Sequence, residues 1–166
     1  SLKSVFTKYK QAYQKRWNSG ISSNPATPAP NVDDVAFLSA IIDSLVVRYS
    51  IDTTRVYSCG FSNGGIMSLL LACQLSHRIA AVASVGGVMT TISAAKYSAT
   101  RPPIPVMLVN GTADTQIPYN GGVTGIYSVD QTVDFWRTKN GCTLPAETLY
   151  VPNISLWDNS TVEVSM

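Results

Sequence analysis

The sequence is poor in charged residues and has no strong excess of either sign. Lysine and arginine together number 12 and the acids 10 among 166 residues, which gives a formal net charge of +2. Nucleic-acid-binding surfaces need clustered positive charge, so this balance supports neither a nucleic-acid partner nor a strongly charged substrate. No apolar run reaches the roughly 18 residues of a membrane-spanning helix. We therefore expect no membrane partner.

Cysteine is also scarce. Cys59, Cys73 and Cys142 match no zinc-ligand spacing, so no metal site is expected, and no organic cofactor is implied. An odd number leaves at least one thiol free or paired with a residue outside this stretch. Cys59 and Cys73 fall in predicted core elements, and we expect both to be buried free thiols.

The length and the 45% apolar content allow one globular domain over residues 1–166. Residues 1–16 place apolar side chains at roughly helical spacing beside lysine and arginine, without an acid. They form either a basic arm for an anionic partner or a solvated helix face, and the second interpretation is favoured. Residues 17–31 are rich in Gly, Ser, Asn and Pro and are predicted to be loop.

Apolar strands alternate with helices between residues 33 and 140. Helices are expected at 33–49, 63–75 and 128–140, and strands at 55–59, 80–87 and 104–111. Two weaker strand candidates follow at 148–151 and 161–166. Continuous apolar strands between helices predict a mostly parallel sheet with helices on both faces. The predicted fold class is therefore α/β.

A G-x-S-x-G pattern, formed by Gly60, Ser62 and Gly64, joins the first of these strands to the next helix. A serine hydroxyl is a weak nucleophile, so catalysis requires a sharp turn that exposes it to a base and to backbone N–H groups. We expect both glycines to be needed because a side chain at either position would crowd this turn. The pattern predicts Ser62 as a nucleophile.

Asp114 follows the strand at 104–111, where functional groups of parallel sheets gather. Its carboxylate could orient a catalytic histidine, or it could form a turn by binding its own backbone. The nucleophile turn two strands earlier favours the catalytic role.

The single histidine, His77, does not complete this pair. It follows Ser62 by 15 positions, at the far end of the next helix, which places it on the order of 20 Å from the hydroxyl. It also precedes Asp114, whereas α/β-hydrolases have the order Ser, acid, His. We expect His77 to be an exposed helix-end residue.

Several segments together resemble a known family. They are N-V-D-D-V-A-F-L (31–38), I-D-T-T-R-V-Y-S-C-G-F-S-N-G-G (51–65), N-G-T-A-D-T-Q-I-P-Y-N-G-G (110–122) and W-R-T-K-N-G-C (136–142). In this order they are similar to the secreted polyhydroxybutyrate-depolymerase-like esterases, a group that includes the feruloyl and acetylxylan esterases of carbohydrate esterase family one. The resemblance covers roughly residues 17–142, leaves 1–16 unmatched, and does not extend to the weak strands in 143–166.

The resemblance implies a partial α/β-hydrolase fold, with Ser62 as nucleophile, Asp114 as triad acid and the backbone N–H of Asn63 as an oxyanion donor. It also implies an oxyanion loop upstream of residue 1, a catalytic histidine downstream of residue 166, and a disulfide from Cys142 to a cysteine just past that end. Without the earlier strands, the nucleophile strand becomes a sheet edge beside an exposed apolar face. We therefore expect the isolated 166 residues to be marginally stable.

The sequence thus predicts part of an extracellular serine carboxylester hydrolase acting on polyesters or on plant cell-wall esters: hydroxyalkanoate, feruloyl or acetyl esters. Two alternatives stay open. One is a non-catalytic α/β-hydrolase-like module that binds polysaccharide or polyester, which a fluorophosphonate probe would fail to label. The other is a serine peptidase of similar fold, which ester and amide turnover distinguish.

Overall fold

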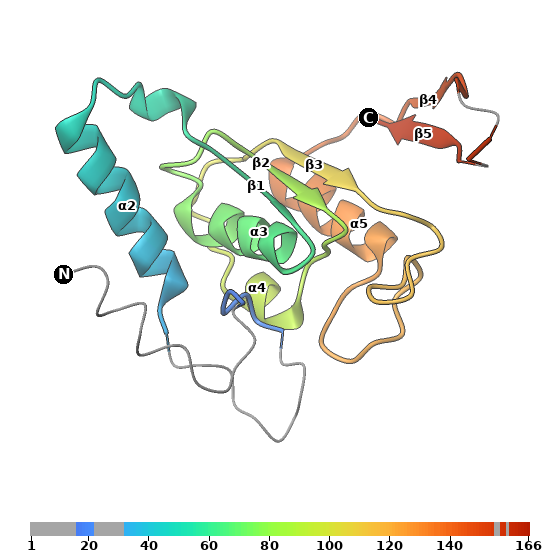
Figure 1. Cartoon of the computed structure of the whole chain (residues 1–166), viewed down its shortest axis with the longest axis horizontal. Coiled ribbons are helices and arrows are strands. Elements are labelled where there is room, and N and C mark those ends of the chain that lie inside the picture. Colours follow the sequence, from blue (N-terminus) through green and yellow to red (C-terminus); the bar gives the residue numbers. More distant parts are fainter. Residues whose placement is uncertain (1–15, 22–31, 155–156, 159) are drawn as a thin grey trace.

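A three-stranded parallel sheet lies at the centre of the computed structural model, which describes residues 16–21, 32–154, 157–158 and 160–166 (Figure 1). The expected helix at 1–16 lies, apart from its last residue, outside the described residues. The elements are α2 (Asp34–Arg48), a 3-10 turn η1 (Thr53–Arg55), β1 (Tyr57–Phe61), α3 (Asn63–Leu75), β2 (Ala81–Val85), α4 (Thr91–Ala95), β3 (Val106–Val109), α5 (Val129–Asn140), β4 (Thr148–Val151) and β5 (Val162–Ser165).

The sheet has the order β1-β2-β3, and both pairs of neighbours are parallel. At their last positions Phe61 pairs with Val85, and Val85 with Val109, so the three carboxyl ends form one edge of the sheet. The predicted α/β class is confirmed, and β1 is an outer strand as expected. The two weak strand candidates pair with each other as the antiparallel hairpin β4–β5, which projects away from the sheet in Figure 1.

Local signals in the sequence account for the helix ends. The Asp33 side chain accepts a hydrogen bond from Ala36 N at 2.9 Å, which caps α2. Ser128 and Gln131 form a reciprocal capping box at the start of α5, and Gly141 ends that helix in the left-handed conformation with φ 68°. No helix in the described part of the chain is both long and apolar enough to cross a bilayer.

The main core lies between the sheet and the helices α3 and α5. Ten of the 13 residues of α3 are buried, so this helix is apolar nearly all round. Val82 of β2, Ile104 before β3 and Trp136 of α5 pack in the same cluster as α3, with Val106 and Leu108 at its margin. Helices α3 and α5 therefore lie on one face of the sheet, the covered face, whose strand residues are Ser58, Gly60, Val82, Ser84, Val106 and Leu108.

Among the described residues, no helix covers the opposite face of the sheet, which corrects two expectations. Helices were expected on both faces, but alternate strand residues that point away from α3 are exposed. These residues, the bare face, are Tyr57, Cys59, Phe61, Val85, Met107 and Val109. Cys59 was expected to be buried and is exposed because no described helix covers this side of β1; Cys73, on α3, is buried as expected.

Candidate active site

The backbone at Ser62 has a conformation that is rare for a residue with a side chain. Ser62 has φ 52° and ψ −118° and is the only non-glycine residue there with a positive φ. Its N–H donates to Val85 O at 2.7 Å, and its carbonyl accepts from Ile66 N at 3.1 Å. Such a conformation costs on the order of 1–3 kcal/mol and persists only where neighbouring structure holds it. The geometry is that of a strand–turn–helix that presents one side chain.

The close approach of β1 and α3 explains why a glycine is needed at position 60 but not why one is needed at position 64. A Cβ on Gly60 would lie 2.3 Å from the carbonyl carbon of Gly64, so no side chain fits there. A Cβ on Gly64 itself would meet no atom within 4 Å, so its expected crowding is wrong. The crowded helix position is Gly65, where a Cβ would lie 2.5 Å from Ser84 Oγ. This glycine faces the sheet, whereas Gly64 faces outward.

The backbone N–H of Asn63 stands at the start of α3, directly after Ser62. The first N–H groups of a helix have no acceptor within the helix, and the helix dipole places partial positive charge there. Ser62 makes no capping bond with its side chain. An anion forming beside the Ser62 hydroxyl would therefore meet an available donor.

Asp114 lies in the loop after β3 and forms a turn with its own backbone. Its Oδ1 accepts hydrogen bonds from Gln116 N at 2.8 Å and from Ile117 N at 2.9 Å. The N–H of Ile117, and then that of Gln116, lowers the pKa of this carboxyl below its usual 3.8. Because both bonds use Oδ1, Oδ2 stays available to a further donor. The turn-forming and the histidine-orienting roles are thus compatible.

Ser62 and Asp114 lie at the same edge of the sheet, on either side of the end of β2. A Cβ on Gly86, the residue after β2, would lie 3.4 Å from the Phe61 ring and 4.0 Å from Asp114 Oδ2. Two strand spacings separate β1 from β3, about 10 Å at roughly 4.8 Å each. An imidazole hydrogen-bonded on both sides occupies a space of this order.

His77 lies away from Ser62 and Asp114, as expected. It is exposed, in the turn after α3, and its Nδ1 lies against Arg101 Nη1. Partial desolvation, and then the positive charges of Arg101 and Arg78, lowers its pKa. The described residues thus hold no histidine near Ser62.

Residues 17–20 are irregular, as expected, but their contacts with Asn63 were not predicted from the sequence. The Asn63 side chain binds Trp17 and Ser19 through three hydrogen bonds, and Ser19 is fully buried. Composition alone shows only that such a stretch is irregular. No local pattern indicates a partner more than 40 positions away.

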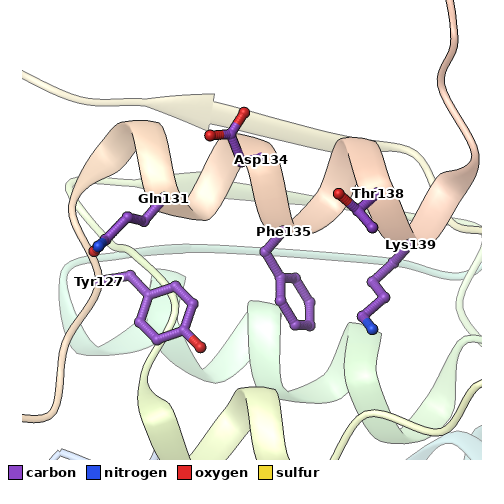
Figure 2. A pocket seen from close by; sticks show the side chains of 6 residues that line it. All are labelled: Tyr127, Gln131, Asp134, Phe135, Thr138 and Lys139. Atoms are coloured by element: carbon purple, nitrogen blue, oxygen red, sulfur yellow. The ribbon is translucent and has the colours of Figure 1, made fainter.

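A surface hollow of about 550 Å³ lies along α5, away from this turn (Figure 2). Tyr127, Phe135 and Lys139 point to the same side of α5 in Figure 2, and the Lys139 ammonium lies 5.1 Å from the Tyr97 ring centre. Neither Ser62 nor Asp114 lines this hollow. Across the described ranges, no three His, Cys, Asp or Glu side chains gather as metal ligands do.

Comparison with known proteins identifies the family to which this chain belongs. The sequence profile of the phospholipase/carboxylesterase family matches residues 31–134. Feruloyl esterase B of Piromyces equi is 31% identical over an alignment of 138 positions, which covers 76% of this chain and 24% of that protein. Feruloyl esterase D of Neurospora crassa is 32% identical over 112 residues, 68% of this chain and 35% of the relative.

A bifunctional acetylxylan esterase/xylanase of Neocallimastix patriciarum is 37% identical over 86 residues, which cover 52% of this chain and 12% of that protein. The chain thus spans well under half the length of these curated relatives. The expected resemblance to feruloyl and acetylxylan esterases is confirmed. Because the family profile covers the turn at Ser62, α3, the whole parallel sheet and Asp114, this chain belongs to the phospholipase/carboxylesterase family.

Proposed function

We propose that this chain carries the nucleophile and the acid of a serine carboxylester hydrolase. The observation that carries the proposal is the backbone of Ser62, held at φ 52° between a parallel strand and the start of a helix. This strained turn places the half-buried Ser62 at the start of α3, beside the first N–H groups of the helix, which have no acceptor within it. The names of the esterase relatives support the same reaction class.

In the proposed mechanism, a histidine from outside these 166 residues takes the Ser62 proton while Oγ attacks the ester carbonyl. The Asn63 N–H and a second donor from outside this chain stabilise the oxyanion, and Asp114 Oδ2 orients the imidazole. The histidine then gives its proton to the departing alcohol. Water attacks the acyl-enzyme and passes a proton to the histidine, which returns it to Ser62 Oγ as the acyl–oxygen bond breaks and the acid is released. No step uses a metal or an organic cofactor.

The proposed substrates are polyesters or acylated plant cell-wall polysaccharides, carrying hydroxyalkanoate, feruloyl or acetyl groups, and the proposed location is extracellular. The relatives named as feruloyl and acetylxylan esterases favour the plant cell-wall esters. Turnover of methyl ferulate, acetylated xylan and polyhydroxybutyrate by the full-length protein would rank the three ester classes.

Replacement of the nucleophile tests the proposal directly. In the full-length protein, Ser62→Ala should abolish p-nitrophenyl ester hydrolysis and labelling by a fluorophosphonate probe. The control is Ser44→Ala, which removes an exposed hydroxyl on α2 that binds only its own helix, at Ala40 O; it should retain both. Ester turnover by Ser62→Ala, or an unlabelled wild-type protein, would contradict the assignment. Faster cleavage of amides than of esters would favour a peptidase.

Replacement of the acid tests Asp114 separately. Asp114→Asn should lower kcat by roughly 10³–10⁴-fold, by analogy with other triads, because the imidazole loses its orienting charge. Since the pKa of Asp114 is lowered from 3.8, the carboxylate is already ionised throughout the range where a histidine titrates, near pH 6.5. The acidic limb of the pH–rate profile should therefore report the histidine alone. A kcat within threefold of wild type would remove Asp114 from the triad.

A further inference from the structure

The side-chain amide of Asn63 hydrogen-bonds to the N–H and the carbonyl of Trp17, as a backbone peptide group would. Its Oδ1 accepts a hydrogen bond from Trp17 N at 2.7 Å, and its Nδ2 donates to Trp17 O at 3.2 Å and to Ser19 Oγ at 2.7 Å. All three bonds reach residues 44 to 46 positions away in the sequence. A residue in the first turn of α3 is thus anchored outside its own helix.

The anchoring segment is itself held by other elements. Ser19 is fully buried, and its carbonyl accepts a hydrogen bond from Ser93 Oγ at 3.5 Å. Asn18 N donates to Asp34 Oδ2 at 2.7 Å, which ties the segment to the start of α2. Gly20, with φ 90°, lies so close to α4 that a Cβ there would be 2.9 Å from Thr90 Oγ1. Figure 1 shows this segment, in blue, beside α4.

Through these contacts, α2, α3 and α4 all help to fix the orientation of the Asn63 backbone, which therefore does not depend on the turn at Ser62 alone. The preceding residue, Ser62, is strained, and a strained turn relaxes unless its surroundings hold it. Oxyanion donors are effective when they are already oriented before the charge develops. The first N–H of α3 follows the strained residue directly, so any relaxation of the turn would rotate it.

We propose that Asn63 has a second role in the reaction proposed above, as a positioning residue. Its side-chain amide, fastened to residues 17–19, fixes the direction in which its own backbone N–H points toward the oxyanion. The inference rests on the proposed esterase function. Because an oriented donor acts on the transition state more than on the bound ester, loss of the amide should lower kcat and leave KM nearly unchanged.

The test compares two asparagines that make the same kind of clamp. Asn140 accepts from Ile104 N at 3.1 Å and donates to Ile104 O at 2.8 Å, at the opposite end of the sheet. In the full-length protein, Asn63→Ala should lower kcat for p-nitrophenyl acetate by about tenfold, less than loss of a whole donor, with KM within twofold. The rate of fluorophosphonate labelling should fall in parallel. Asn140→Ala should lower the melting temperature but retain kcat.

Ser19→Ala supplies a second variant that removes only one of the three bonds and should lower kcat by about threefold. In the double variant, kcat should equal that of Asn63→Ala alone, because both changes act through the same contact. Wild-type kcat in Asn63→Ala, an equal loss in Asn140→Ala, or a change confined to KM would overturn the inference while leaving Ser62 as nucleophile. Failure of the wild-type protein to hydrolyse esters or react at Ser62 would overturn both proposals.

Discussion

Along β1, the covered face of the sheet carries smaller side chains than the bare face. On the covered face, Ser58, Gly60 and Ser84 are small, and α3 packs directly on them. On the bare face, Tyr57 and Phe61 are large and are 63% and 76% exposed. Small residues are needed where a helix must approach closely, so the side chains that face α3 along β1 are selected for size more than for hydrophobicity. Strands that are apolar on both sides are typical of sheets covered on both sides.

The largest contrast should appear in thiol chemistry. Burial raises the pKa of Cys73, on α3, to about 12, so at pH 8 only about one molecule in ten thousand is a thiolate. Cys59, on the bare face, is exposed. In the 166-residue chain we expect iodoacetamide to alkylate Cys59 at least about a thousandfold faster than Cys73, because the thiolate is the reactive form. Peptide mass spectrometry over time would measure both rates, and comparable rates would abolish the contrast between the faces.

The next largest effect should follow a cavity beneath the covered face. Leu70 of α3 is 1% exposed, and in the full-length protein Leu70→Ala should lower the free energy of unfolding by about 3 kcal/mol. Urea titration followed by fluorescence of the buried Trp136 would measure the change. A loss below about 1 kcal/mol would mean that α3 is not well packed against the sheet.

A smaller loss in the free energy of unfolding should result from adding a methyl group between β1 and α3. Gly60→Ala places a Cβ against the Gly64 backbone and should cost about 2 kcal/mol, since neither backbone can move far. Gly64→Ala, which meets open space and favours helix, should be neutral or slightly stabilising. Melting temperatures of the two variants give the comparison. Equal decreases in melting temperature would show that stability depends on both glycines of the G-x-S-x-G pattern, and not only on the one where β1 and α3 approach closely.

The smallest effect should follow a polar substitution on the bare face. Met107 is 61% exposed, and Met107→Ser in the 166-residue chain should change the free energy of unfolding by no more than about 0.5 kcal/mol. The same change should raise solubility because it reduces an apolar patch. Static light scattering and urea titration would record the two effects. A loss comparable to that of Leu70→Ala would mean that something covers Met107 in solution.

Much of this architecture could be predicted from residue patterns. The alternation of apolar strands and helices indicated the parallel sheet, and G-x-S-x-G located the turn at Ser62. Periodicity does not report which face a neighbour covers, so the exposure of Cys59 was not foreseen. The pattern also could not distinguish Gly64 from Gly65, because the difference depends on the direction in which each Cβ points. Nor did composition reveal that Asn63 binds Trp17, since a long-range hydrogen bond leaves no local signal.

The positive φ of Ser62 links the stability of the fold to the proposed chemistry. Glycine adopts such a conformation freely, so replacing this serine by glycine would relieve the chain of a local conformational penalty. A search for heat-resistant variants would therefore favour the loss of the one hydroxyl that the turn displays. Under the proposed function, tolerance to heat and ester turnover compete for this single position.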